Sequence, residues 1–264
     1  MAEYIDIGVN LTGSSFSHDL AGVIERAQAV NVQRMIVTGT DITHSRQALT
    51  LCGQYPGVLY ATAGVHPHHA NDFNQPMVEI LRQLAGNTAV VAIGECGLDY
   101  NRNYSTPQAQ RQAFEAQLQL ACELQLPVFL HQRDAHADFV AMLETYRHEL
   151  VAAVAHCFTE NEAIALEYVD MGLYLGITGW ICDERRGMAL RHAVKSIPLD
   201  RLMLETDAPY LLPRDLESPP RDKRRNEPCY LPHIAGVTAR CMRLETQVLA
   251  QAVLENTRRF FRLD

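Results

Sequence analysis

Residues 91–100 read Val-Ala-Ile-Gly-Glu-Cys-Gly-Leu-Asp-Tyr, and this stretch decides the predicted fold. The apolar run at its start is typical of a buried β-strand, which is predicted to end at Gly94. Glu95 then lies at the carboxyl end of a strand, where the active sites of parallel barrels are found. Further apolar runs in the chain also end in a residue that can bind metal, at His66, His131, His156 and Asp207. The sequence therefore predicts a ring of polar side chains at strand ends.

Eight strand-like runs alternate with segments of helical periodicity along the 264 residues. Thr106-Pro107 resembles a helix N-cap followed by proline in the first turn. The predicted strands are residues 4–9, 35–37, 59–63, 91–94, 128–130, 152–155, 173–177 and 202–204. This order predicts a single α/β domain over residues 1–264 with the (β/α)8 TIM-barrel fold, and a doubly wound open sheet is the weaker alternative.

Composition limits the function classes. The formal net charge of -8 argues against broad binding to duplex nucleic acid, which needs a basic face, but allows a small cleft that holds a few phosphates. No apolar run approaches the roughly 20 residues of a membrane span, so no membrane partner is expected. The seven cysteines are odd in number and form no Cys-x-x-Cys pair, which indicates reduced thiols. Because the N-terminus also lacks an export signal, we expect a cytoplasmic location.

The candidate site combines residues from four predicted strands. A closed barrel would bring together Glu95, His131, His156 and Asp207, although they span more than a hundred residues. Two imidazoles and two carboxylates suit a divalent metal such as Zn²⁺, Mn²⁺ or Mg²⁺. A single histidine at a strand end is more simply a hydrogen-bonded core or rim residue. Four such residues in the same structural position favour a metal site.

The positions of the lysines limit which residue could bridge two metal ions. Many two-metal barrel hydrolases bridge their ions with a carboxylated lysine on an inner strand. The only lysines here are Lys195 and Lys223, and neither lies in a strand pattern. Any bridging ligand must therefore be a carboxylate, and Glu95 is the candidate.

The segment 211–228 interrupts the alternation of strands and helices. It contains four prolines and five basic residues, Arg214, Arg221, Lys223, Arg224 and Arg225. We expect a long loop over the active face, followed by closing helices after Leu231. Arginine side chains in such a loop suit a phosphate-bearing substrate better than a neutral ring.

Six motifs occur in order along nearly the whole chain. They are Gly-Val-His-Pro (64–67), Gly-Glu-Cys-Gly-Leu-Asp (94–99), His-Gln-Arg-Asp-Ala (131–135), His-Cys-Phe-Thr (156–159), Glu-Thr-Asp-Ala-Pro-Tyr-Leu (205–211) and Arg-Asn-Glu-Pro (225–228). Together they resemble the motifs of the TatD family, metal-dependent deoxyribonucleases within the amidohydrolase-like barrels. The resemblance implies a metal-dependent hydrolase that acts on ester bonds.

The resemblance also implies roles for the residues of the candidate site. Glu95 would bridge or bind metal, and His131 and His156 would be metal ligands. Asp207 would be both a ligand and the general base. His66 would contact the scissile phosphate or help to orient the attacking water.

Three further residues are implied in substrate binding. Arg133 would pair with a substrate phosphate, although a structural salt bridge is a nearly equal alternative for an arginine at a strand-to-helix turn. Asn226 and Glu227 would contact substrate. Their local sequence, taken alone, favours an Asx-type turn ahead of Pro228.

The chain departs from the family pattern at its first strand. Most members carry Asp-x-His-x-His there, with both imidazoles pointing into the barrel, whereas residues 6–10 here read Asp-Ile-Gly-Val-Asn. One ion would be held by Glu95, His131 and His156. The other would be left with Glu95, Asp207 and Asn10, so we expect one firm divalent-metal site and a weaker second. Mg²⁺ or Mn²⁺ is expected in catalysis, with Zn²⁺ as an alternative.

The expected activity is hydrolysis of a phosphodiester by metal-activated water, with Asp207 accepting the proton. The resemblance implies a 3'-5' exodeoxyribonuclease that prefers single-stranded DNA ends and also acts on RNA, with a role in DNA repair or DNA fragmentation. We expect it to be a monomer. One alternative is a small-molecule amidohydrolase or lactonase on the same barrel. Another is a binding or quality-control protein whose metal site has decayed.

Overall fold

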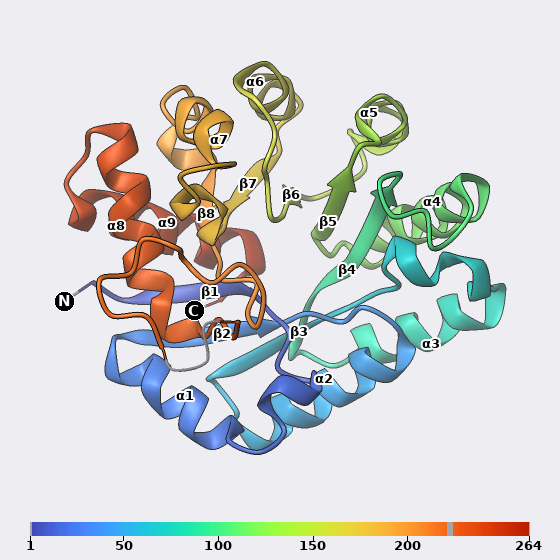
Figure 1. Ribbon diagram of the computed structural model, residues 1–264. Coiled ribbons are helices and arrows are strands. Elements are labelled where there is room, and N and C mark those ends of the chain that lie inside the picture. Colours follow the sequence, from blue (N-terminus) through green and yellow to red (C-terminus); the bar gives the residue numbers. More distant parts are fainter. Residues whose placement is uncertain (1, 221–223, 264) are drawn as a thin grey trace. The chain divides into compact units, whose positions relative to one another are not determined.

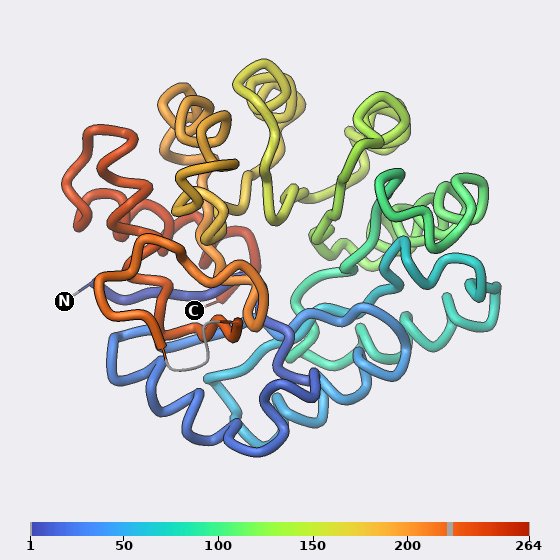
Figure 2. The backbone as a smooth tube through the Cα atoms, in the orientation of Figure 1, coloured from blue at the N-terminus to red at the C-terminus, as the bar shows by residue number. Residues whose placement is uncertain are grey.

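The structure is a computed structural model that describes residues 2–220 and 224–263. The chain forms two compact units, one made of Met1–Val37 with Cys157–Asp264 and the other of Thr38–His156. Figure 1 labels the α-helices and β-strands of each unit, and the path of the backbone can be followed by colour in Figure 2. The single domain expected over residues 1–264 stays a prediction. Arg221 and Lys223 of the basic segment lie outside the described residues.

The unit Thr38–His156 is built on four parallel strands. They are β3 (Leu59–Ala63), β4 (Val90–Asp99), β5 (Val128–Arg133) and β6 (Ala153–Ala155), each paired with the next. The helical elements are α2 (Ile42–Gln54), the 3-10 helix η2 (Pro67–Asp72), α3 (Gln75–Ala85), α4 (Pro107–Leu124) and α5 (His136–Tyr146). The predicted cap of α4 is confirmed, since Thr106 Oγ1 accepts the Ala109 N–H at 3.2 Å.

The other unit holds the remaining four strands. They are β1 (Tyr4–Val9), β2 (Val32–Val37), β7 (Tyr174–Ile177) and β8 (Leu202–Leu204), with β1 parallel to β2 and β7 parallel to β8. A parallel bridge between Val9 and Ala208 joins the end of β1 to the residues after β8. The helical elements are η1 (Ser14–Phe16), α1 (Leu20–Ala29), α6 (Glu162–Asp170), η3 (Gly179–Cys182), α7 (Met188–Ala193), η4 (Leu199–Arg201), η5 (Pro228–Tyr230), α8 (Leu231–Met242) and α9 (Thr246–Phe261).

All eight predicted strands are confirmed, with shifts at several ends. The strands are hydrogen-bonded in chain order from β1 to β8, and a helical element follows each of them. This is the connectivity of a (β/α)8 fold. A doubly wound sheet would instead reverse its strand order at a switch point, so that alternative is wrong.

β4 is longer than the sequence pattern predicts, because it continues from Gly94 to Asp99. Gly94 and Gly97 have φ values of 136° and 141°, which other residues rarely adopt. A Cβ at Gly94 would lie 2.2 Å from the Phe129 carbonyl oxygen, and one at Gly97 would lie 1.9 Å from the His131 carbonyl oxygen. The two glycines therefore let β4 lie close against β5, with a register shift between Gly94 and Cys96. Glu95 sits inside a strand at this irregularity rather than beyond its end.

Two buried glutamines of α4 hold the ends of neighbouring strands. Gln117 accepts the Val65 N–H at 2.7 Å and donates to the Val65 carbonyl at 3.0 Å, just after β3. Gln110 does the same for Asp99, at 2.8 and 3.0 Å, at the end of β4. Such paired amide contacts satisfy backbone groups that leave the sheet. They fix the chain where the candidate site begins.

Among the described residues, no helix is both long and apolar enough to cross a bilayer. All seven cysteines are free of disulfide bonds, as the sequence pattern indicated.

Candidate metal centre

Glu95 is the centre of a buried cluster in the unit Thr38–His156. Its residue exposure is 5%, and its backbone N–H donates to the Gly39 carbonyl at 2.8 Å. One carboxylate oxygen, Oε1, faces imidazole nitrogens of three histidines, from the ends of β3, β5 and β6. A buried carboxylate needs such partners, because burial of an unpaired charge is costly. The three histidines are His66, His131 and His156.

His156 makes the shortest of these contacts, with Nε2 2.7 Å from Glu95 Oε1. It follows β6 directly, its N–H donates to the Leu130 carbonyl at 2.9 Å, and its ring packs on Phe129 with centroids 4.6 Å apart. His131 lies within β5, and its Nδ1 is 3.0 Å from Glu95 Oε1. The structure thus brings Glu95, His131 and His156 together, and their role as metal ligands stays a prediction.

His66 joins the cluster from the loop after β3. Its Nδ1 accepts the His68 N–H at 3.1 Å, as the N-cap of η2. A neutral imidazole has one protonated nitrogen, so this contact assigns the proton to Nε2. His66 Nε2 lies 3.3 Å from Glu95 Oε1 and can donate to it.

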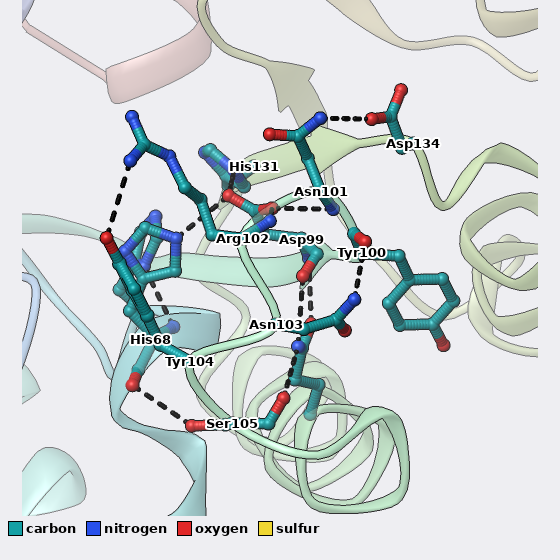
Figure 3. Close-up of polar contacts among 12 residues, drawn as sticks. His68, Asp99, Tyr100, Asn101, Arg102, Asn103, Tyr104, Ser105, His131 and Asp134 are labelled. Carbon is teal, nitrogen blue, oxygen red and sulfur yellow. Dashed lines mark hydrogen bonds and ion pairs between the residues drawn. The ribbon is translucent and has the colours of Figure 1, made fainter.

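Asp99 is a buried carboxylate that the sequence reasoning missed. Figure 3 shows it between His68 and His131 at the end of β4. Its Oδ2 accepts from His68 Nε2 at 2.8 Å and lies 3.4 Å from the buried Nε2 of His131. Its Oδ1 accepts the N–H groups of Asn101 and Arg102 at 3.0 and 2.8 Å. Asp99 thus ties two histidines to the loop that leaves β4.

A signal for Asp99 was present in the sequence. Residues i and i+4 of a strand point to the same face, so Asp99 follows Glu95 toward the same side if β4 continues. The predicted end of the strand at Gly94 hid this relationship. His68, the partner of Asp99, was also not assigned a role.

The charges of the cluster are strongly coupled. Burial favours the neutral form of Glu95, but the charge of His156 and hydrogen bonds from His131 and His156 outweigh it and hold the pKa of Glu95 well below its usual value. Burial lowers the pKa of His66 to about 4, against the opposing effect of Glu95, so His66 is neutral near pH 7. Burial also opposes charge on His131, but hydrogen bonds to Asp99 and Glu95 raise its pKa above the usual value.

Asp207 lies in the other unit, just after β8. Its Oδ1 accepts from Asn10 Nδ2 at 3.0 Å, and its N–H donates to the Gly8 carbonyl at 2.9 Å. Asn10 also donates to the Ala208 carbonyl at 3.3 Å. The structure therefore brings together Asn10 and Asp207, the pair expected to serve the weaker ion. That Asp207 acts together with Glu95 stays a prediction.

Arg133 is exposed at the end of β5, two residues after His131. Residues two apart in a strand share a face, so both side chains leave β5 on the same side. Its guanidinium forms no ion pair with any residue that the structure describes. The alternative of a structural salt bridge therefore has no support, and phosphate binding stays a prediction.

Asn226 and Glu227 have partners within their own unit. Asn226 is fully buried, and its Nδ2 donates to the Thr206 carbonyl at 2.9 Å. Its Oδ1 accepts the Glu227 N–H at 2.9 Å. Arg26 donates to both carboxylate oxygens of Glu227, and Arg225 donates to Oε1 at 2.7 Å. These contacts hold the chain next to Asp207, and direct substrate contact by either residue stays a prediction.

The donor set of the Glu95 cluster fits a divalent cation. One ligand atom each from His66, Glu95 and His131 lie within 4.8 Å of one another. Imidazole nitrogens with a carboxylate oxygen suit Zn²⁺ or Mn²⁺, whereas Mg²⁺ prefers oxygen ligands alone. Because His66 Nδ1 is already occupied by a backbone N–H, His131 and His156 are better placed as ligands than His66.

Comparison with known proteins gives a consistent result. The family described as TatD related DNase matches residues 5–262. A curated protein from Pectobacterium atrosepticum, named 3'-5' ssDNA/RNA exonuclease TatD, is 53% identical over 258 residues, which cover 98% of this chain and 99% of the relative. The crystal structure of a TatD homologue from Escherichia coli K12 is 28% identical, covers 99% of this chain and 98% of its own, and has a TM-score of 0.89. A TatD family hydrolase from Entamoeba histolytica is 26% identical, with a TM-score of 0.88 and 98% coverage of both chains.

These similarities extend over the whole (β/α)8 connectivity, so the fold is a TIM barrel. The matched residues 5–262 span all six motifs that carry the candidate site residues. The chain therefore belongs to the TatD related DNase family.

Proposed function

We propose that this chain is a metal-dependent 3'-5' exonuclease that hydrolyses phosphodiester bonds at the ends of single-stranded DNA and also of RNA. The observation that carries the proposal is the approach of three histidines, at 2.7 to 3.3 Å, to one carboxylate oxygen of Glu95. Family membership and the activity for which the Pectobacterium relative is named support the substrate and the polarity. An intact cluster of this kind argues against a decayed metal site.

Glu95, His131 and His156 would hold the firmly bound ion. A bound divalent cation supplies positive charge for the phosphate and lowers the pKa of a water molecule. Asp99 would keep His131 in a fixed orientation, because a carboxylate behind an imidazole sets its tautomer and direction. A second, weaker ion would rely on Glu95, Asp207 and Asn10.

The remaining residues would bind the substrate phosphate or accept the proton of the attacking water. His66 would donate from Nε2 to a phosphate oxygen, since its Nδ1 accepts a backbone N–H and it is neutral near pH 7. Asp207 would accept the proton of the attacking water. Arg133 would pair with a phosphate. Its exposed guanidinium forms no ion pair among the described residues, so it is available for this contact.

We propose that the enzyme is a monomer located in the cytoplasm. Its proposed role is in DNA repair or DNA fragmentation. The free cysteines are consistent with a reducing compartment. The negative net charge of -8 suits a protein that admits a strand end rather than one that coats a duplex.

The test uses single-stranded DNA and RNA oligonucleotides labelled at either end, with Mg²⁺, Mn²⁺ or Zn²⁺. We expect a 3' label to be released at once and a 5' label to give a descending ladder. His131→Ala should abolish both, whereas His148→Ala, an exposed histidine of the same unit, should not. Intact labelled strands with metal-replete protein would refute the proposal, and cleavage of a lactone or amide instead would favour a small-molecule hydrolase.

A further inference from the structure

A second group of metal-capable side chains lies in the unit that does not contain Glu95. Cys182 ends η3, Asp215 belongs to the segment 211–228, and His233 lies in the first turn of α8. One ligand atom from each of the three lies within 4.8 Å of the other two. They come from three elements that are up to about fifty residues apart in sequence, so local chain geometry does not explain their meeting.

The distances are close to those of a zinc site. A tetrahedral Zn²⁺ with Zn–S near 2.3 Å and Zn–N or Zn–O near 2.0–2.1 Å has ligand atoms about 3.3 to 3.8 Å apart. Here the three atoms lie within 4.8 Å, and His233 Nε2 is 2.7 Å from Asp215 Oδ1. Shifts of about 1 Å would give the tetrahedral distances. Cys182 is fully buried, whereas Asp215 is exposed, so an ion would enter from the side of Asp215.

A nucleophilic Cys-His-Asp triad does not fit the same three residues. Cys182 has 0% exposure, so no substrate reaches its sulfur. Burial and the neighbouring Asp215 raise the pKa of the Cys182 thiol, which is the opposite of an activated nucleophile. A metal-bound thiol, in contrast, is deprotonated by the ion itself. The positive charge of Arg191, which is held by a 2.7 Å hydrogen bond to the Ile181 carbonyl, favours that thiolate.

We propose that Cys182, Asp215 and His233 bind one Zn²⁺ ion through sulfur, carboxylate oxygen and Nε2, with water in the fourth position. On binding, the thiol proton is released to solvent, and the ion replaces the proton on His233 Nε2, so that the neutral imidazole carries its proton on Nδ1. The site shares no residue with the Glu95 cluster. It joins residues 211–220 to η3 and α8, and Arg214, the neighbour of Asp215, lies 3.3 Å from Glu184. Its role is to fix residues 211–220.

Cobalt substitution separates this site from the Glu95 centre. The chelator-treated protein is titrated with Co²⁺, and the cobalt–thiolate charge-transfer absorption is recorded, because the Glu95 cluster offers no thiolate ligand. We expect the absorption in the wild type and in His131→Ala, and its loss in Cys182→Ser. Zinc counted after dialysis should fall by one ion per chain in Cys182→Ser relative to the wild type.

Two kinds of control keep the result independent of folding. Asp215→Asn changes an exposed residue and should weaken Zn²⁺ binding at this site by at least about tenfold, the lower bound for loss of a supporting ligand contact. Cys52→Ala, at another buried cysteine, and Asp200→Asn, at another exposed aspartate, should leave the cobalt absorption unchanged. No thiolate absorption in the wild type, or equal absorption in Cys182→Ser, would overturn the proposal whatever the nuclease assay gives.

Discussion

The buried carboxylate of Asp99 lies 3.4 Å, Oδ2 to Nε2, from the imidazole of His131. The other ring nitrogen of His131 faces Glu95 at 3.0 Å, so the imidazole is set between two carboxylates. This arrangement matches the carboxylate–histidine–metal relay in which the outer carboxylate orients the ligand.

Asp99→Asn should weaken metal binding by about 10- to 100-fold, because His131 loses the carboxylate that orients it. Asp99 also raises the pKa of His131, so the variant should show a lower His131 pKa in an NMR titration of the metal-free protein. Asp72→Asn, at an exposed aspartate of the same unit, is the matched control. Unchanged metal affinity and an unchanged His131 titration would exclude this positioning role.

Asn10→His should strengthen binding of the second ion. Asn10 Nδ2 already contacts Asp207 Oδ1 at 3.0 Å, and an imidazole there would restore one of the two ligands that most of the family has. Metal counting after dialysis should give more ions per chain than in the wild type. Asn10→Ala, which removes the amide without adding a ligand, should show no gain. If the wild type already retains two ions per chain after dialysis, the prediction that the second ion binds weakly is wrong.

Asp6 should make the stability of the protein fall with rising pH. The carboxyl is fully buried, and burial raises its pKa from 3.8 to about 8, against hydrogen bonds from Thr206 and Gly8. The folded state therefore keeps a proton that the unfolded chain loses near pH 4. The stabilisation is complete below pH 4 and is lost progressively as the pH rises toward 8. Urea unfolding from pH 5 to 8 should show a weaker pH dependence in Asp6→Asn than in the wild type or in Asp200→Asn.

Glu227→Gln should lower the free energy of unfolding by about 1.5–3 kcal/mol, the range for hydrogen bonds to charged groups. The Glu227 side chain is only 12% exposed and accepts from Arg26 at 2.7 Å and Arg225 at 2.7 Å. Urea denaturation measures the loss, with Glu255→Gln on α9 as an exposed control. The KM for single-stranded DNA distinguishes a structural role of Glu227 from direct substrate contact. A raised KM with unchanged stability would favour the substrate contact that family resemblance implies.

The fold and the core of the site follow from the sequence because their signals are local. Each strand is a short apolar run, and His131 and His156 directly follow or end such runs. The carboxyl ends of parallel strands lie on one edge, so residues of the same type at those positions meet. For this reason Glu95, His131 and His156 could be predicted together.

The missed features depend on the backbone or on contacts between distant segments. The extension of β4 requires the positive φ of Gly94 and Gly97 and their close approach to β5, which an apolar pattern does not encode. Because Asp99 lies in this extension of β4, its position beside Glu95 was not predicted either. The group of Cys182, Asp215 and His233 comes from a 3-10 helix, a loop and a helix, whose meeting has no periodic signal.

The central claim is that metal binding and catalysis depend on the Glu95 carboxylate. The most direct test compares metal content and release of a 3' label from single-stranded DNA in the wild type, Glu95→Gln and Glu95→Ala. The glutamine keeps the size of the side chain but removes the charge that pairs with His131 and His156 at 3.0 and 2.7 Å. We expect both variants to lose the firmly bound ion and at least about 100-fold of the activity, a barrier increase of about 2.7 kcal/mol. Retention of both metal and activity in Glu95→Ala would contradict the account.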